Sequence, residues 1–191
     1  MLEKEFIEDF SQEFGLALSQ LVLEIKKELV AQGHKLTGDL ERSIQLEIET
    51  KPNLIRGLIY MNDYGLTVDQ GVTPDRIPYT PRKRGEGRGG TSKYIQGLLT
   101  FWLLKGLSQK EALQAAFATA NKHKQEGIPS RGSFIHSTNG RRKFFFTGTV
   151  ERLEEEITDL IASKTENVVA LAFNNIIDGF VKRLDPVVIQ A

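Results

Sequence analysis

The sequence predicts an α+β fold, in which a small antiparallel sheet packs with long N- and C-terminal helices and an inserted helical hairpin. Three observations predict it. Apolar residues recur every three or four positions over residues 3–32 and again over about 150–180, which is the period of an amphipathic helix. Residues 44–50 alternate between apolar and polar side chains, as a half-buried strand does. Two serine-capped helical segments fill residues 92–125.

Composition limits the class of protein. The chain has 191 residues, enough for a hydrophobic core, and we predict one domain over residues 1–191. Its 25 basic and 25 acidic side chains balance, which argues against a dedicated nucleic-acid or membrane binder but leaves local charged patches open. There is no cysteine, so disulfides and thiolate zinc sites are excluded. The first residues lack an apolar signal segment and no segment could span a bilayer, so we expect a protein made in the cytoplasm with no membrane partner.

The first half of the chain is predicted as a helix followed by a β-hairpin. The helix over residues 3–32 ends at Gly33, since glycine favours a helix C-terminus. An apolar helix face normally packs in the core of its own domain. This helix is long for a domain of this size, so the alternative is that part of its apolar face packs on a neighbouring subunit. Residues 37–43, TGDLERS, predict a short capped turn or helix. The strand at 44–50 then pairs with a returning strand at 54–62 across a proline-containing turn.

Residues 63–93 contain few regular signals and much proline and glycine, so we predict a mobile basic loop at about 72–92. Five basic residues stand against one acid, Glu86. They are Arg82, Lys83, Arg84, Arg88 and Lys93.

Two interpretations of this loop stay open. It is a solvated loop whose charges keep it soluble, or it contacts DNA or an acidic protein partner. Its G-x-G-x-x-G pattern at Gly85, Gly87 and Gly90 is not a dinucleotide site, because such a turn must follow a buried strand directly and proline-rich residues precede it here.

The helical hairpin has its own start signals. Ser92 is predicted to cap a helix that runs to about Leu104, and Ser108 with Glu111 forms a capping box for a second helix through about Gln125.

Residues 134–146 predict two short strands around Asn139-Gly140, because Asn-Gly is a strong hairpin signal. In such a hairpin, three consecutive phenylalanines need cover on both faces, either from the domain itself or from a partner. The second alternative makes Phe144, Phe145 and Phe146 a candidate subunit interface. Thr147 or Thr149 is then predicted to cap the final helix, from about Val150 to Phe180.

No catalytic constellation is present, so we expect a protein that is not an enzyme and holds no cofactor. The histidines at positions 34, 123 and 136 lack metal-ligand spacing, and the serines lack a nucleophile elbow. Asp63, Asp69 and Asp75 are expected to form turns rather than a catalytic pair.

The order of these features resembles the tailed-phage neck and tail-completion proteins of the HK97 gp10-like group. The resemblance lies in Thr37-Gly38-Asp39-Leu40-Glu41-Arg42-Ser43-Ile44 after a long helix, in Tyr64 followed by Val68-Asp69-Gln70-Gly71-Val72, and in the alanine-rich helix that ends before Gly127-Ile128. It touches landmarks from about residue 1 to 165. The chain departs from the family pattern at Arg131-Gly132-Ser133-Phe134, where an R-P-F-like segment is usual.

The resemblance implies a structural virion protein of the head-tail connector, a neck or tail completion protein that joins head and tail through ring assembly. The implied partners are further copies of the chain, other phage connector and tail proteins, and DNA in the channel. No catalytic residues carry over. The implied fold determinants are Thr37 as a cap, Gly38 for a tight backbone, Leu40 and Ile44 for the core, Ser43, and Asp69 and Gly71 at the loop entry. The alternative is a sequence-independent DNA-binding module that uses the basic loop 82–93.

Overall fold

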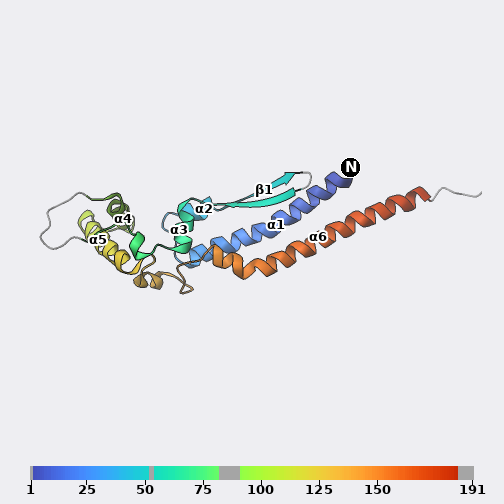
Figure 1. The fold of residues 1–191 in the computed structure, drawn as a ribbon. Helices are drawn as coiled ribbons and strands as arrows, with labels where there is room; N and C mark the ends of the chain where they lie inside the picture. Colours follow the sequence, from blue (N-terminus) through green and yellow to red (C-terminus); the bar gives the residue numbers. More distant parts are fainter. Residues whose placement is uncertain (1, 52–53, 82–90, 185–191) are drawn as a thin grey trace, which may run out of the picture. The chain divides into compact units, whose positions relative to one another are not determined.

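A computed structural model describes residues 2–51, 54–81 and 91–184 (Figure 1). It is mostly helical with a two-stranded antiparallel sheet, so the predicted α+β class is confirmed. The elements in chain order are α1 (Leu2–Ala31), α2 (Asp39–Ser43), β1 (Gln45–Lys51), β2 (Leu54–Tyr60), α3 (Tyr64–Gln70), η1 (Pro74–Arg76), α4 (Lys93–Leu104), α5 (Gln109–Glu126), η2 (Arg131–His136) and α6 (Thr147–Leu184).

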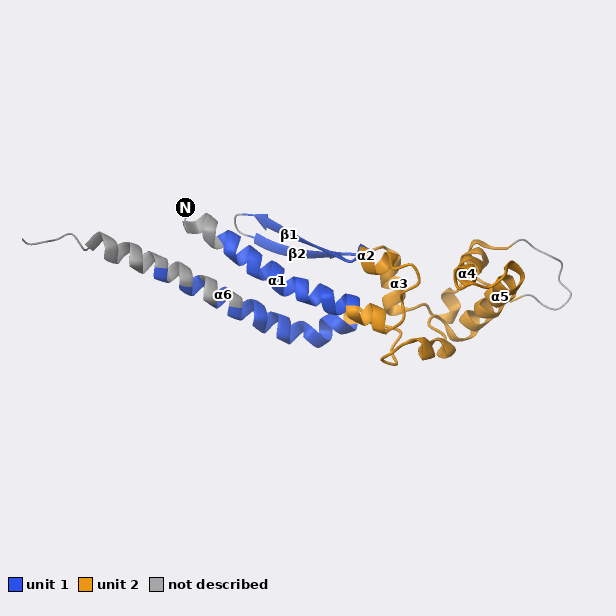
Figure 2. Cartoon of the chain, turned by 180° about the vertical axis from the view of Figure 1, so that it is seen from behind, with its two compact units in different colours: residues 1–26, 43–61, 148–191 blue, residues 27–42, 62–147 orange. Residues whose placement is uncertain are grey.

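The chain folds as two compact units (Figure 2). Unit 1 consists of Met1–Lys26, Ser43–Met61 and Gly148–Ala191. Unit 2 consists of Lys27–Arg42 and Asn62–Thr147. That the two units act as one domain over residues 1–191 stays a prediction.

In unit 1 the β-hairpin packs on α1. Strands β1 and β2 pair antiparallel from Gln45 opposite Tyr60 to Lys51 opposite Leu54, close to the predicted limits. The hydroxyls of Ser11 and Thr50 lie 2.9 Å apart across this contact. At Gly57 the backbone of β2 lies so close to α1 that a Cβ there would overlap the Leu18 Cδ1 methyl group. This close approach explains why a glycine stands inside a strand.

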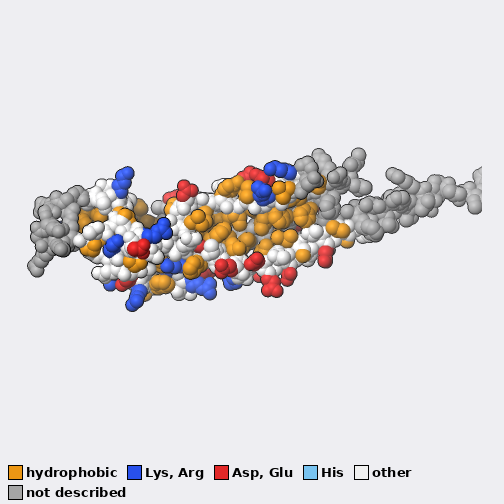
Figure 3. Space-filling view, viewed as in Figure 1, with side chains coloured by type: hydrophobic (Ala, Val, Ile, Leu, Met, Phe, Trp, Pro, Cys, Tyr) orange, Lys and Arg blue, Asp and Glu red, His pale blue; other side chains and the backbone are white. Residues whose placement is uncertain are grey.

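The core of unit 1 is apolar and draws on separate parts of the chain. Its buried side chains come from α1, from the residue before β1 and from the first turns of α6, and they include Ala17, Leu21, Val22, Ile25, Ile44, Leu153 and Ile157. The predicted helix stripes are therefore confirmed where they are described. On another face of α1, Leu16 and Leu23 are more than half exposed, at 54% and 52%. The two leucines are about two helical turns apart, so they lie on the same side of the helix. Figure 3 shows hydrophobic side chains gathered on the face of unit 1 that is in view.

In unit 2 the helical hairpin of α4 and α5 forms as predicted. The Ser92 hydroxyl accepts a hydrogen bond from the Ile95 amide at 3.3 Å, which caps α4. Ser108 and Glu111 form the capping box of α5, as the S-x-x-E spacing predicts. The two helices approach through small residues of α5 that are fully buried, namely Ala112, Ala116 and Ala120.

One helix was not predicted. Residues 64–70 form α3, in the part of the chain that the sequence predicts to be irregular. This helix is only about two turns long, so too few apolar residues recur along it for a helical period to be detected in the sequence.

Candidate functional site

The candidate site lies in unit 2, where the residues before α6 meet α3 and the end of α1. Asp69, near the end of α3, is fully buried. Its Oδ1 accepts hydrogen bonds from the amides of Phe146 at 2.7 Å and Thr147 at 3.3 Å, and its Oδ2 accepts one from the Thr147 hydroxyl at 2.8 Å. Asp69 therefore caps the first turn of α6 from a distant part of the chain, where a carboxylate also opposes the positive end of the helix dipole.

This arrangement corrects the predicted start of the last helix. Either Thr147 or Thr149 is expected to be the cap, but α6 begins at Thr147 and contains both of them. The prediction is wrong because the capping oxygen comes from Asp69, and the Thr147 hydroxyl donates to that carboxylate.

The three phenylalanines before α6 occupy three different environments. Phe145 is completely buried, and its ring centroid lies 6.3 Å from that of His34. Phe146 is half-buried, whereas Phe144 is 54% exposed. Phe144 also has a φ of 60°, which is rare for a bulky residue, and its amide donates to the backbone oxygen of Asp69 at 2.7 Å. The same residue that caps α6 thus fixes the left-handed turn that directs Phe144 away from the core.

The predicted hairpin at 134–146 is wrong. The segment begins with η2 and contains no strand. Asn139-Gly140 still makes a turn, since Gly140 has a φ of 70° and the Asn139 side chain accepts from the Arg141 amide at 3.1 Å. The flanking backbone pairs elsewhere, however, because the Thr138 amide donates to Ala31 at the end of α1 at 2.8 Å.

Hydrogen bonds to the end of α1 continue along this segment. The buried Gln32 side chain donates to the backbone oxygen of Lys143 at 2.9 Å, and Arg142 Nη1 donates to the backbone oxygen of Gln32 at 2.6 Å. The Asn139 amide group donates to Glu28 at 2.8 Å. The segment is irregular but held at several points along its length.

His34 is part of the same junction. Its Nε2 lies 3.3 Å from the backbone oxygen of Arg142. Burial, followed by the charge of Arg142, lowers the pKa of His34 to about 4, against smaller opposing effects from the Arg142 hydrogen bond and the Asp69 charge. A neutral imidazole can donate from Nε2 to that carbonyl oxygen. Burial also lowers the pKa of Arg142.

Gly71 closes the other side of the junction. Val72 and Ile128 exchange two backbone hydrogen bonds of 2.8 Å in an isolated antiparallel bridge. Gly71 has a φ of 78°, and a Cβ there would overlap the backbone oxygen of Ile128. The glycine is needed both for its conformation and for the close approach of the two segments.

Residues 37–44 contain five of the residues that the resemblance implies as fold determinants. The Thr37 hydroxyl lies at the start of α2 and accepts from the Asp39 amide at 3.4 Å. That same hydroxyl, and then Arg42, lower the pKa of the Asp39 carboxyl by hydrogen bonding to it. Gly38 has a φ of 78°. Leu40 and Ile44 are buried and Ser43 is half-buried.

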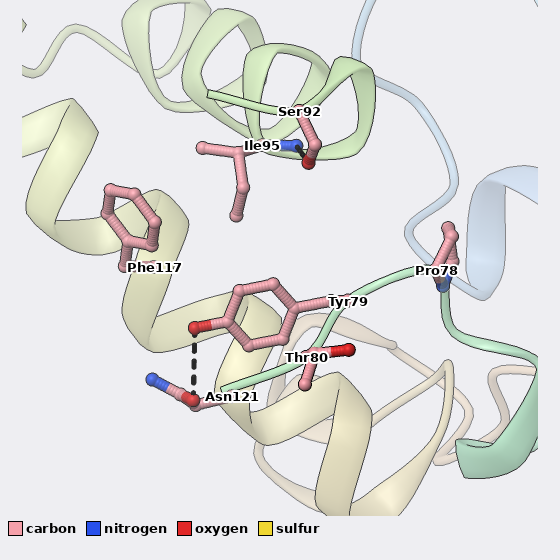
Figure 4. Close-up of a pocket in the computed structure, with 7 residues that line it drawn as sticks. All are labelled: Pro78, Tyr79, Thr80, Ser92, Ile95, Phe117 and Asn121. Carbon is pink, nitrogen blue, oxygen red and sulfur yellow. Dashed lines mark hydrogen bonds between the residues drawn. The ribbon is translucent and has the colours of Figure 1, made fainter. Parts of the chain in front are cut away.

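A pocket of about 430 Å³ opens beside the helical hairpin (Figure 4). The Tyr79 hydroxyl donates to Asn121 at 3.2 Å, and the Ile95 side chain points toward the tyrosine ring (Figure 4). Its described lining is Pro78, Tyr79, Thr80, Ser92, Ile95, Phe117 and Asn121, which carry no charge. The pocket offers apolar contact and hydroxyl or amide groups, but no acid, base or nucleophile pair.

The basic residues predicted to contact DNA or a partner are not brought into this site. Arg82, Lys83, Arg84 and Arg88 lie outside the described residues, as does the middle of the predicted mobile loop, residues 82–90. The part of that loop before residue 82 is described, and it contains η1 and the buried Ile77. Lys93 is described, and it is the exposed first residue of α4.

Sequence reasoning placed Asp69 at a loop entry and missed its contact with Phe146 and Thr147. The contact spans 77 and 78 residues, and no local pattern links the two segments. One signal in the sequence could have indicated a distant cap. Phe144, Phe145 and Phe146 immediately precede the final helix, and none of them has a polar side chain that could cap it.

The described part of the chain contains no group of three or more His, Cys, Asp or Glu side chains placed to hold a metal ion. Among its helices, none is long and apolar enough to cross a membrane. Comparison of the chain with protein-family models, curated proteins and solved structures finds no match.

Proposed function

We propose that the chain is a structural subunit of the head-tail connector of a tailed phage, in the neck or tail completion layer, and that it joins head and tail through ring assembly. In this proposal it is made in the host cytoplasm and ends in the virion. It works by contact with further copies of itself and with other connector and tail proteins.

The observation that carries the proposal is the meeting of two of the resembling segments. Val72, which follows Asp69 and Gly71, pairs with Ile128 at the end of the alanine-rich helix. The landmarks of the resemblance are thus linked by backbone contacts within unit 2, as residues that determine a shared fold would be.

Exposed apolar surface supports a role in contact. Leu16 and Leu23 are exposed on α1 in unit 1, and Ile135 and Phe144 are exposed in unit 2 at 82% and 54%. A heterologous ring contact uses two different surfaces of each subunit, and both units offer such side chains.

The test combines genetics with measurement of mass. A stop codon early in the gene should leave filled heads and free tails that do not join, and a copy supplied in trans should restore joined particles. Mass photometry of the purified protein with its connector partners should find discrete multimers. A protein that stays monomeric, and whose loss leaves head-tail joining unchanged, would contradict the proposal.

A further inference from the structure

Residues 131–144 of unit 2 expose apolar and basic side chains together. Ile135 is 82% exposed, Phe144 54% and Phe134 39%. Arg131 and Arg141 are exposed in the same segment. Single exposed apolar residues are common, but here three of them fall within eleven consecutive positions, 134–144, beside two arginines. We call this segment the 131–144 surface.

The 131–144 surface is fixed in place rather than free to fold its apolar side chains inward. Thr138 is bound to Ala31 and Arg142 to Gln32 at the end of α1, by the hydrogen bonds described above. The amide of Phe144 is bound to Asp69, which holds that residue at a φ of 60°. A surface whose conformation is already set loses little entropy on binding, which favours association.

Charge indicates what the surface binds. Between residues 127 and 147 the chain has four basic residues, Arg131, Arg141, Arg142 and Lys143, and no acid. Two acids from outside this range contact it, Glu126 at the Arg131 amide and Glu28 at Asn139, so the surface keeps a net positive charge. A partner of opposite charge is therefore expected. Exposed Ile135 and Phe144 favour a protein partner over DNA. Contacts to DNA phosphates come mainly from basic and polar groups, so the apolar side chains of Ile135 and Phe144 would not contribute to them.

An acidic surface of opposite charge lies on α6 in unit 1. Glu151, Glu154, Glu155 and Asp159 are all exposed, and their helical spacing puts them on one face, opposite the buried Leu153. Figure 3 shows acidic side chains gathered over α6.

From this complementarity we infer that the 131–144 surface of one copy binds the acidic face of α6 on a second copy. The inference rests on the proposed function and deepens it by naming the two surfaces. Because the surfaces differ, the contact is heterologous and each copy has one of each, so that successive copies bind in the same sense around a ring.

The experiment uses two charge-reversal variants of the full chain. The first carries Arg131→Glu and Arg141→Glu, and the second carries Glu151→Lys and Glu155→Lys. In each variant alone, the 131–144 surface and the acidic face of α6 have charges of the same sign and repel each other between copies. The Kd of self-association should therefore rise by at least about tenfold, which is the scale of close charge pairs at interfaces. An equimolar mixture should assemble again, because the reversed surfaces pair with each other and the unreversed surfaces pair as in the native chain.

Apolar contact is tested separately by Ile135→Ser, which should weaken association. Leu66→Ser is the matched control, because Leu66 is a 52% exposed leucine on α3 outside the surface and its replacement should leave association unchanged. Thermal unfolding of each variant shows whether the fold is kept.

The masses, measured by sedimentation velocity across protein concentration, decide the inference. Recovery of multimers in the mixture supports it. Multimers of native mass in both separate variants would overturn it while leaving ring assembly, and hence the proposed function, intact. A native chain that stays monomeric would also overturn it. If the first variant kept the native multimer mass but bound DNA less tightly than the native chain, the 131–144 surface would be a DNA contact and the inference would be overturned as well.

Discussion

The hydroxyl of Thr147 donates to Asp69 Oδ2 at 2.8 Å and joins residues 78 positions apart in the chain. Through this contact, and through the amides of Phe146 and Thr147, one buried carboxylate caps α6. The backbone oxygen of Asp69 also accepts from the Phe144 amide. Asp69 thus sets both the start of the last helix and the exposure of Phe144.

Replacement of Asp69 by alanine should lower the free energy of unfolding by about 2–4 kcal/mol, since it removes a helix cap and leaves the partly buried amides of Phe146 and Thr147 without this acceptor. Urea titration followed by circular dichroism measures this. Asp63→Ala is the control, because Asp63 is exposed and makes no side-chain cap bond at α3; we expect a change within about 0.5 kcal/mol. Equal effects of the two substitutions would show that Asp69 does not cap α6.

Two glycines should respond oppositely to alanine. Gly71→Ala should destabilise the protein by about 1–3 kcal/mol, because its φ of 78° is unfavourable for alanine and the new Cβ would meet the backbone oxygen of Ile128. Gly97→Ala should stabilise it by up to about 1 kcal/mol, because Gly97 lies within α4 and a Cβ there has nothing within 4 Å. Thermal unfolding temperatures of both variants test the pair. If Gly71→Ala raised the unfolding temperature, the close approach of Val72 and Ile128 would be refuted.

Stability should fall as the pH is lowered from about 6.5 towards 4. The pKa of His34 is about 4 in the folded protein, whereas an unperturbed histidine has a pKa of 6.5. Between these values the unfolded chain binds more protons than the folded chain, so acid favours unfolding. Burial lowers the pKa of His123 as well, which adds to the effect in the same direction.

Urea titrations of His34→Gln at several pH values should show a smaller loss of stability over this range than the native chain shows. The exposed His136 provides the control substitution, His136→Gln. A native chain whose stability is flat between the two pKa values would contradict the buried, neutral state of His34.

Ser92→Ala should cost about 1 kcal/mol of stability, since the Ser92 hydroxyl accepts from the Ile95 amide at the start of α4. Ser130 occupies the corresponding position before η2 but makes no side-chain cap bond, so Ser130→Ala should have a much smaller effect. Hydrogen exchange at the Ile95 amide gives a local measurement, and unchanged protection there in Ser92→Ala would count against the cap.

The parts of the fold that could be predicted from sequence are those determined by local patterns. Ser92, Ser108 and Glu111 indicated the starts of α4 and α5, because a helix cap is a contact between residues three positions apart. The alternation over residues 44–50 indicated β1, because successive side chains of a strand point to opposite faces of the sheet.

The candidate site could be predicted only in part, because distant contacts determine it. Asp69 and Gly71 stand out in the sequence, but their partners lie near Thr147 and Ile128, and no spacing rule connects these positions. The Asn139-Gly140 turn is present as predicted, yet the backbone at Thr138 bonds to α1 instead of completing a hairpin. A turn signal fixes a local conformation but not the partner of the residues beside it.

Immunogold electron microscopy of particles of the encoding phage tests the proposed role most directly. An antibody to this chain should label joined particles at the junction of head and tail, and particles assembled without the chain should carry no label and no joined tail. Intact, joined particles that lack the chain altogether would contradict the proposal that it is a structural subunit of the connector.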